Sequence, residues 1–169
     1  MENVVQREDR EEEYIRRLYK HHKEFFDIEF KDIKKLKKIG RGGFGCVYEA
    51  KWKGEVVAVK RIFLEAQNSY KYLVREVSNL RVLNHDNVIR HIGVCHDNFK
   101  AIYLVTEYVD GDALSKCYKK VRGAYGLIYF ILLNIARGMT YLESINMLHR
   151  DLKLANVIVL LSIFFHLIL

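Results

Sequence analysis

The chain has 169 residues, of which 50% are hydrophobic and 29% charged, enough for one domain or two small lobes. This composition excludes a disordered, collagen-like or multi-span membrane protein. Lys and Arg outnumber Asp and Glu by 28 to 21, and the resulting charge of +7 favours anionic partners such as nucleotides, phosphorylated peptides, acidic lipids or nucleic acid. With three cysteines and no apolar N-terminal segment, we expect an intracellular, cytoplasmic protein.

Residues 1–32 are dense in charge, and their apolar side chains fall roughly on one helical stripe. The stripe consists of Tyr14, Ile15, Leu18, Phe25 and Phe26. We therefore predict an amphipathic helical extension. A basic membrane-surface helix is the alternative, and the acidic run from Glu8 to Glu13 disfavours it. The lysines from Lys31 to Lys38 alternate with apolar residues and predict an exposed edge strand.

The next elements follow from the period of the apolar residues. The pattern predicts antiparallel strands at 45–52 and 56–62 around a turn at Gly54, a helix at 69–83, and strands at 88–94 and 101–109. Beyond Gly111 it predicts a short helix at 112–120 and a long helix at 127–144. The long helix is apolar on most sides, so we expect it to be buried.

A glycine-rich run at residues 40–47 reads Gly-Arg-Gly-Gly-Phe-Gly-Cys-Val, a G-x-G-x-x-G-x-V pattern. Glycines allow a loop to bring backbone N–H groups against phosphate oxygens, because no Cβ is in the way. In a dinucleotide-binding fold the last glycine opens a helix. Here the chain continues as a strand after Gly45, which disfavours that fold.

Lys60 ends the apolar strand Val57-Ala58-Val59-Lys60. A phosphate-binding lysine needs a carboxylate to hold it, and Glu76 shares a helical face with the apolar Val77 and Leu80. We therefore predict an ion pair between Lys60 and Glu76. An ordinary lysine at a strand end is the alternative.

Residues 149–156 read His-Arg-Asp-Leu-Lys-Leu-Ala-Asn and fit the pattern H-R-D-L-x-x-x-N. This motif follows the glycine run and Lys60 in the chain. The three motifs in this order make residues 33–160 resemble the eukaryotic protein kinases. The resemblance implies an α+β fold, with a five-stranded N-lobe and one helix at 33–109 and a partial helical C-lobe at 110–160. Residues 1–32 would then be an extension and 161–169 an apolar tail unlike the family.

The family likeness also implies two cofactors, ATP and Mg²⁺, and a set of site residues. Lys60, oriented by Glu76, would bind phosphates, Asp151 would accept the substrate proton, and Asn156 would ligate Mg²⁺. Lys153 would approach the transferred phosphate, an arrangement typical of serine/threonine kinases. The hinge Thr106-Glu107-Tyr108 and residues 136–144 instead resemble the tyrosine kinases and their serine/threonine relatives, so the likeness is to a tyrosine-kinase-like serine/threonine kinase. ATP contacts are implied for Ile39, Gly40, Arg41, Gly42, Gly43, Phe44, Gly45, Val47, Ala58, Lys60, Thr106, Glu107, Val109 and Ile158.

The sequence departs from the family after Asn156, since it contains no Asp-Phe-Gly, whose aspartate would hold the principal Mg²⁺. We therefore expect an incomplete and inactive serine/threonine kinase domain that acts on protein substrates. The rival interpretation is a non-catalytic, pseudokinase-like module that binds nucleotide or regulates a full-length kinase partner. A nucleic-acid partner is disfavoured because no groove-helix or stacking motif is present.

The apolar segment from Leu154 to Leu169, which includes this tail, carries no Asp, Glu, Lys or Arg. Three interpretations stay open: a membrane anchor, a strand that packs on the lobe, or a stretch that is not kinase sequence. A membrane span needs about 20 apolar residues, more than remain once Asn156 belongs to the catalytic loop. We therefore expect no membrane anchor.

Overall fold

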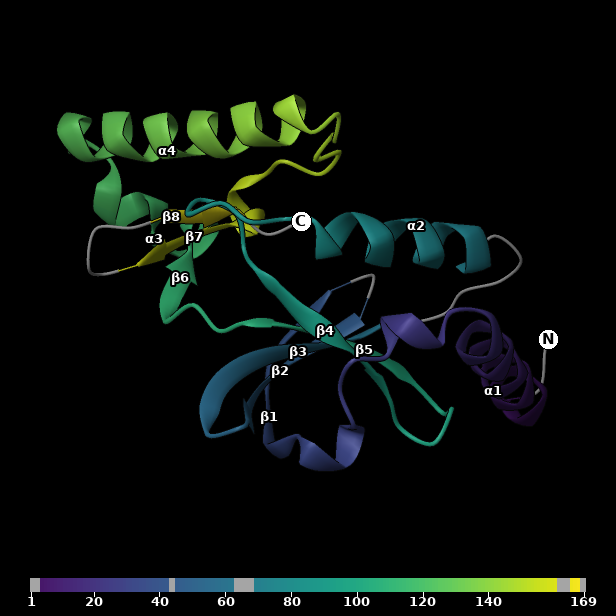
Figure 1. Cartoon of the computed structure of the whole chain (residues 1–169). Helices are drawn as coiled ribbons and strands as arrows, with labels where there is room; N and C mark the ends of the chain where they lie inside the picture. Colours follow the sequence, from purple (N-terminus) through teal and green to yellow (C-terminus); the bar gives the residue numbers. More distant parts are fainter. Residues whose placement is uncertain (1–3, 43–44, 63–68, 161–164, 168–169) are drawn as a thin grey trace. The chain divides into compact units, whose positions relative to one another are not determined.

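The computed structural model describes residues 4–42, 45–62, 69–160 and 165–167 (Figure 1). Contacts divide the chain into two compact units, one of residues 1–82 and 91–108 and the other of residues 83–90 and 109–169. The first unit holds a five-stranded antiparallel sheet with helices, and the second is mainly helical with a small sheet. The α+β, kinase-like fold class expected from the sequence is confirmed.

The first unit begins with a helix and then builds its sheet. Its elements are α1 (Val4–His21), η1 (Lys23–Phe25), η2 (Phe30–Asp32), β1 (Lys34–Gly42), β2 (Gly45–Trp52), β3 (Glu55–Ile62), α2 (Ser69–Arg81), β4 (His91–His96) and β5 (Ile102–Glu107). The strand order is β1-β2-β3-β5-β4, so β1 is the edge strand that the lysine-rich segment predicts.

Local turn chemistry explains the β2–β3 hairpin. Lys53 and Gly54 have φ angles of 50° and 88°, and Trp52 pairs with Glu55 across the turn. Two consecutive left-handed residues match the twist of the flanking strands, and glycine adopts such angles without steric cost. The hairpin is therefore where the sequence predicts it.

Both faces of the five-stranded sheet are covered within the first unit. One face buries Val57, Val59 and Val105 against Ile28 and Ile33 of the segment that precedes β1. The opposite face carries a second cluster that joins α1, α2, β4 and β5. Its buried members are Ile15, Leu18, Phe25, Val77, Val94, Ile102 and Leu104.

The second unit combines two helices with a three-stranded sheet. Its elements are β6 (Gly111–Ala113), α3 (Leu114–Val121), α4 (Tyr125–Ser144), η3 (Leu154–Asn156), β7 (Val157–Leu160) and β8 (Phe165–Leu167). The strand order is β6-β7-β8, and both pairings are antiparallel.

Two boundaries differ from the sequence-based expectation because tertiary pairing decides them. Residues 111–113 form β6 rather than the start of a helix, since Asp112 pairs with Val159 of β7. The strand predicted at 88–94 is observed as β4 at His91–His96, where its pairing with β5 begins and ends. The partner of β6, strand β7, lies far along the chain and is not contained in the local apolar pattern around residues 111–113.

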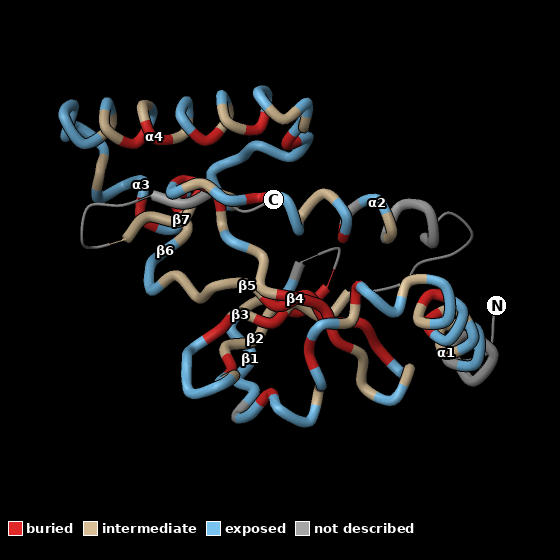
Figure 2. The backbone as a smooth tube through the Cα atoms, viewed as in Figure 1, coloured by how far each residue is buried: buried red, intermediate tan, exposed pale blue. Residues whose placement is uncertain are grey.

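The long helix α4 is buried along one side only, as Figure 2 shows. Ile131, Gly138 and Leu142 are buried, whereas Tyr129 and Leu132 are 69% and 58% exposed. The burial that the apolar pattern predicts is therefore observed on one side of this helix and not on the other. Within the described residues, α4 is also the helix long and apolar enough to cross a membrane, a test that core helices of soluble proteins pass as well.

The backbone of the tail fits the strand interpretation. Val157, Ile158 and Val159 of β7 pair with residues 165–167 of β8. Residues 161–164 and 168–169 lie outside the described part of the chain. Whether residues 161–169 are foreign to the kinase sequence stays a prediction.

Candidate active site

Most of the glycine-rich run lies in the antiparallel strands β1 and β2. Gly40 and Gly42 lie in β1, and Gly42 pairs with Gly45 of β2. The chain thus continues into a strand, unlike a dinucleotide-binding loop. Gly43 and Phe44, which the resemblance implies as ATP contacts, lie outside the described residues.

Two glycines of this hairpin differ in what the fold requires. A Cβ on Gly45 would overlap the backbone carbonyl oxygen of Arg61 in the neighbouring strand. A Cβ on Gly40 would meet only the Cβ of Val47, at 3.9 Å. Packing within the protein therefore demands glycine at 45 and leaves room for a Cβ at 40.

Lys60 sits in β3, a central strand of the sheet. It lies opposite Val47 of β2 and Leu104 of β5, and two residues earlier Ala58 lies opposite Thr106. Directly opposed residues of antiparallel strands point to the same side, as do residues two apart in one strand. The sheet therefore gathers all five side chains on one face.

The same face carries α2. Leu104, opposite Lys60, belongs to the cluster that includes Val77 of α2, the residue next to Glu76. The side chain of Glu76 is outside the described part of the structure, so its ion pair with Lys60 stays a prediction. The register of β3 and the packing of α2 are compatible with it.

Three of the predicted ATP contacts, Thr106, Glu107 and Val109, lie at or just after the end of β5. Thr106 donates a hydrogen bond from Oγ1 to the carbonyl oxygen of Glu107 at 3.2 Å. Val109 belongs to the second unit, and its carbonyl oxygen accepts the N–H of Gly111 at 2.9 Å. Of the other predicted contacts, Ile39 and Arg41 are exposed on β1, and Ile158 is half-buried in β7.

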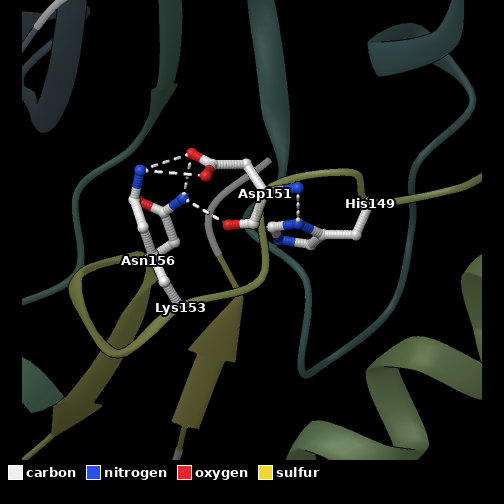
Figure 3. A network of polar contacts seen from close by, with 4 residues as sticks. All are labelled: His149, Asp151, Lys153 and Asn156. Carbon is white, nitrogen blue, oxygen red and sulfur yellow. Dashed lines mark hydrogen bonds and ion pairs between the residues drawn. The ribbon is translucent and has the colours of Figure 1, made fainter.

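In the second unit the structure brings Asp151, Lys153 and Asn156 together, as Figure 3 shows. Lys153 Nζ lies 2.9 Å from Asp151 Oδ1 and 2.7 Å from Oδ2. Asn156 Nδ2 donates to the Asp151 carbonyl oxygen at 2.8 Å and to Oδ2 at 2.9 Å. The carboxylate is thus held from two sides by residues close in the chain.

These two donors also set the charge of the carboxyl group. The hydrogen bond from Lys153 and then that from Asn156 hold the pKa of Asp151 below its usual value near 3.8. Asp151 is therefore ionised at neutral pH. An exposed carboxylate in a fixed position can accept a proton from a hydroxyl group.

His149 also belongs to this cluster, although it is not among the predicted site residues. The Asp151 N–H donates to the His149 carbonyl oxygen at 2.9 Å and to Nδ1 at 3.3 Å. Since Nδ1 accepts, the neutral ring carries its proton on Nε2. Nε2 is buried and has no hydrogen-bond partner among the described residues. The signal was present in the sequence, because His149 opens the H-R-D motif.

Arg150 lies between these two residues with a φ angle of 63°. A left-handed conformation at a residue other than glycine costs free energy and persists only where the surroundings hold it. Here the hydrogen bonds of Asp151 on one side and the buried His149 ring on the other fix the backbone. The turn aims the Asp151 carboxylate at Lys153 and Asn156.

The residues present can hold a metal ion only in part. Because Asn156 Nδ2 makes both bonds to Asp151, its Oδ1 is the oxygen suited to Mg²⁺, which prefers oxygen ligands. Among the described residues, no group of three His, Cys, Asp or Glu side chains could hold a metal ion. A bound Mg²⁺ would therefore depend on substrate phosphates and water for its other ligands.

Comparison with known proteins places this arrangement in a family. The model of the protein kinase domain matches residues 33–164, which contain the glycine hairpin, Lys60 and the Asp151 cluster. The chain belongs to the protein kinase family. In this kinase sequence, α4 lies inside the matched stretch and α1 lies before it.

Curated relatives agree with the assignment. The chain is 38% identical over 143 residues to "Kinase and exchange factor for Rac A" of Dictyostelium discoideum, covering 82% of this chain and 10% of that protein. It is 33% identical over 144 residues to human "Mitogen-activated protein kinase kinase kinase 7", covering 79% and 22%. It is 33% identical over 135 residues to "RasGEF domain-containing serine/threonine-protein kinase X" of Dictyostelium discoideum, covering 79% and 14%. The chain therefore spans a quarter or less of these relatives.

The comparisons confirm the resemblance to protein kinases on which the sequence-based prediction rests. The roles of the individual site residues and the division at residues 32, 109 and 160 stay predictions. The structure places these residues in two groups, one on the sheet face around Lys60 and one around Asp151.

Proposed function

We propose that this sequence carries the nucleotide-binding and catalytic-loop parts of an ATP- and Mg²⁺-dependent protein kinase that phosphorylates serine and threonine hydroxyls. The observation that carries the proposal is the Asp151 cluster, in which Lys153 and Asn156 both hold the carboxylate. Two relatives are named as a mitogen-activated protein kinase kinase kinase and as a serine/threonine-protein kinase. These names support serine and threonine as the residues that are phosphorylated.

Each residue has a task in this proposal. Bound ATP supplies the phosphoryl group, and Mg²⁺ neutralises part of its charge. Backbone N–H groups of the β1–β2 hairpin and the Lys60 ammonium bind phosphate oxygens. Asp151 orients the substrate hydroxyl and accepts its proton, while Lys153 stabilises the carboxylate and approaches the transferred group. Asn156 Oδ1 ligates the metal ion.

A second candidate is a nucleotide-binding or kinase-regulating module without turnover. It is favoured by one observation, the absence of Asp-Phe-Gly from these 169 residues. Without that aspartate, charge that develops during phosphoryl transfer is poorly neutralised. For the polypeptide of residues 1–169 alone, we therefore propose MgATP binding with negligible phosphoryl transfer.

The test is MgATP binding by calorimetry on residues 1–169, together with transfer from radiolabelled ATP to a serine- and threonine-containing protein. We expect Lys60→Met to weaken MgATP binding at least tenfold. Lys51→Met, an exposed lysine on the neighbouring strand β2, is the matched control and should bind like the unmutated chain. Equal affinities for the two variants would contradict the assigned site.

The transfer assay separates the two candidates. Metal-dependent transfer that Asp151→Asn abolishes would favour the kinase over the non-catalytic module for this polypeptide. No transfer, combined with binding that depends on Lys60, would favour the module. Localisation in the cytoplasm and a protein partner are part of the same proposal.

A further inference from the structure

The segment before the kinase match contributes to the core of the first unit. Ile15 and Leu18 of α1 are 0% and 1% exposed. They share a buried cluster with Val77 of α2 and Leu104 of β5. Leu104 lies opposite Lys60, so the same sheet face carries α1, α2 and the predicted nucleotide contacts.

A second connection joins this segment to the end of α2. Arg81, the last residue of α2, donates from Nη1 to the carbonyl oxygen of Glu24 at 2.5 Å and from Nη2 to Asp27 Oδ1 at 3.1 Å. One planar guanidinium thus reaches two acceptors of one chain segment, a geometry that fixes orientation as well as distance.

A third connection joins the segment to the β4–β5 hairpin. The Arg16 guanidinium lies 4.4 Å from the centroid of the Phe99 ring, and the Tyr19 ring contacts His96 edge-on at 5.0 Å. The backbone N–H of Ile28 also donates to the Val94 carbonyl oxygen of β4 at 3.2 Å. Residues 9–28 are therefore tied both to the sheet and to the helix packed on it.

We propose that residues 9–28, here called the brace, set the position of α2 on the sheet, with Arg81 as the positioning residue. Because α2 carries Glu76, the brace then controls how well Lys60 is oriented for phosphate. This regulatory role rests on the proposed function. When Arg81 no longer binds Glu24 and Asp27, the two hydrogen bonds described above between the C-terminal end of α2 and the brace are lost. Nucleotide binding at the distant Lys60 site is then weakened.

The first measurement needs no nucleotide. Hydrogen exchange followed by mass spectrometry on the full chain reports the amide protection of α2. We expect Arg81→Gln to accelerate exchange in α2 at least fivefold, and Arg81→Lys, which keeps the charge but not the planar fork, to give a smaller increase. Arg75→Gln, an exposed change on the same helix, is the matched control and should leave exchange unchanged.

The second measurement tests positioning. We expect Arg81→Gln to weaken MgATP binding by three- to tenfold in the unmutated background and not at all in the Lys60→Met background. A merely structural role would weaken binding equally in both. Near-ultraviolet circular dichroism of each variant verifies that it is folded. Asp27→Asn, which removes the ion pair but leaves the bond to the Glu24 carbonyl oxygen, should give a smaller effect in the same direction.

The outcomes are distinguishable. Unchanged α2 exchange in Arg81→Gln would overturn the brace outright. Faster exchange with unchanged MgATP affinity would overturn its link to Lys60. If the unmutated chain fails to bind MgATP, the proposed function falls and the link to Lys60 falls with it, whereas faster α2 exchange in Arg81→Gln would still support the brace.

Discussion

The two units hold their functional residues in different ways. In the first unit, Lys60 is fixed by the register of a central strand, and both faces of the sheet are covered by segments far apart in the sequence. In the second unit, Asp151 is exposed, and its side-chain bonds come from residues within five positions. The unit with the proposed nucleotide contacts therefore depends on long-range packing, and the proposed catalytic loop depends on local hydrogen bonds.

The same contrast applies to the helices. On α1, Ile15 and Leu18 are fully buried, although charged residues dominate its sequence. On α4, a largely apolar sequence leaves Tyr125, Tyr129 and Leu132 exposed. Exposed apolar side chains in such a row mark a surface suited to association. The position of a helix on its neighbours decides burial more strongly than its mean hydropathy does.

The largest expected effect compares these two helices directly. Leu18→Ala should lower the free energy of unfolding of the first unit by roughly 2–4 kcal/mol, because it removes a buried side chain and leaves a cavity. Leu132→Ala on α4 should change stability by less than about 0.5 kcal/mol, since that side chain is exposed. Urea unfolding of both variants measures the difference. Equal losses would contradict a core role for α1.

A pH series addresses the first unit through His91, at the start of β4. Burial, with a smaller contribution from the charge of Arg81, lowers the pKa of His91 to about 4 from its ordinary 6.5. The unfolded chain therefore binds a proton between these values that the folded chain does not. Stability is fully present above pH 6.5 and should fall by ~2–3 kcal/mol as the pH drops towards 4.

His91→Gln should flatten this part of the stability profile, measured by urea unfolding between pH 4 and pH 7. His21→Gln, at an exposed position at the end of α1, is the matched control and should keep the slope. An unaltered slope in His91→Gln would assign the pH dependence to other groups.

Substitutions in the β1–β2 hairpin distinguish a glycine that the fold requires from a glycine that phosphate binding would require. Gly45→Ala should destabilise the first unit by about 1–3 kcal/mol, because its Cβ overlaps the Arg61 carbonyl oxygen. Gly40→Ala brings a methyl group into ordinary van der Waals contact with the Val47 Cβ, so its stability should remain within about 0.5 kcal/mol of the unmutated chain. If Gly40→Ala nevertheless weakens MgATP binding in calorimetry, the cause is that the added methyl group hinders the approach of phosphate, and not that the protein is less stable. Unfolding at equal urea concentrations for the two variants would contradict the distinction.

The smallest expected effect concerns a polar contact in the second unit. Asn134 of α4 accepts a hydrogen bond from Asn87 Nδ2 at 3.0 Å and donates to the Phe130 carbonyl oxygen at 2.8 Å. Asn134→Ala should cost roughly 1–2 kcal/mol in thermal unfolding, because the side chain is buried. Asn84→Ala, at an exposed position of the same unit, supplies the comparison. A loss no larger than that of Asn84→Ala would show that the contact does not stabilise the unit.

Much of the fold could be predicted from the sequence where the signal is local. The β2–β3 hairpin follows from the alternation of apolar residues and from Gly54, and α2 from its apolar spacing. An element paired with a distant partner was harder: residues 112–113 of β6 were expected as helix, although they pair with β7 about 45 residues further along the chain. The choice between strand and helix there depends on the partner strand, which a local window does not contain.

The sequence by itself determined the family, because the order and spacing of Gly40, Lys60 and the 149–156 motif match the kinase pattern, and from that pattern it predicted the chemistry. Only the tertiary structure decided that Ile15 and Leu18 join the core, that Arg81 binds the segment before β1, and that α4 exposes one side. The physical reason is that chemistry resides in individual side chains, whereas burial depends on which distant segments meet.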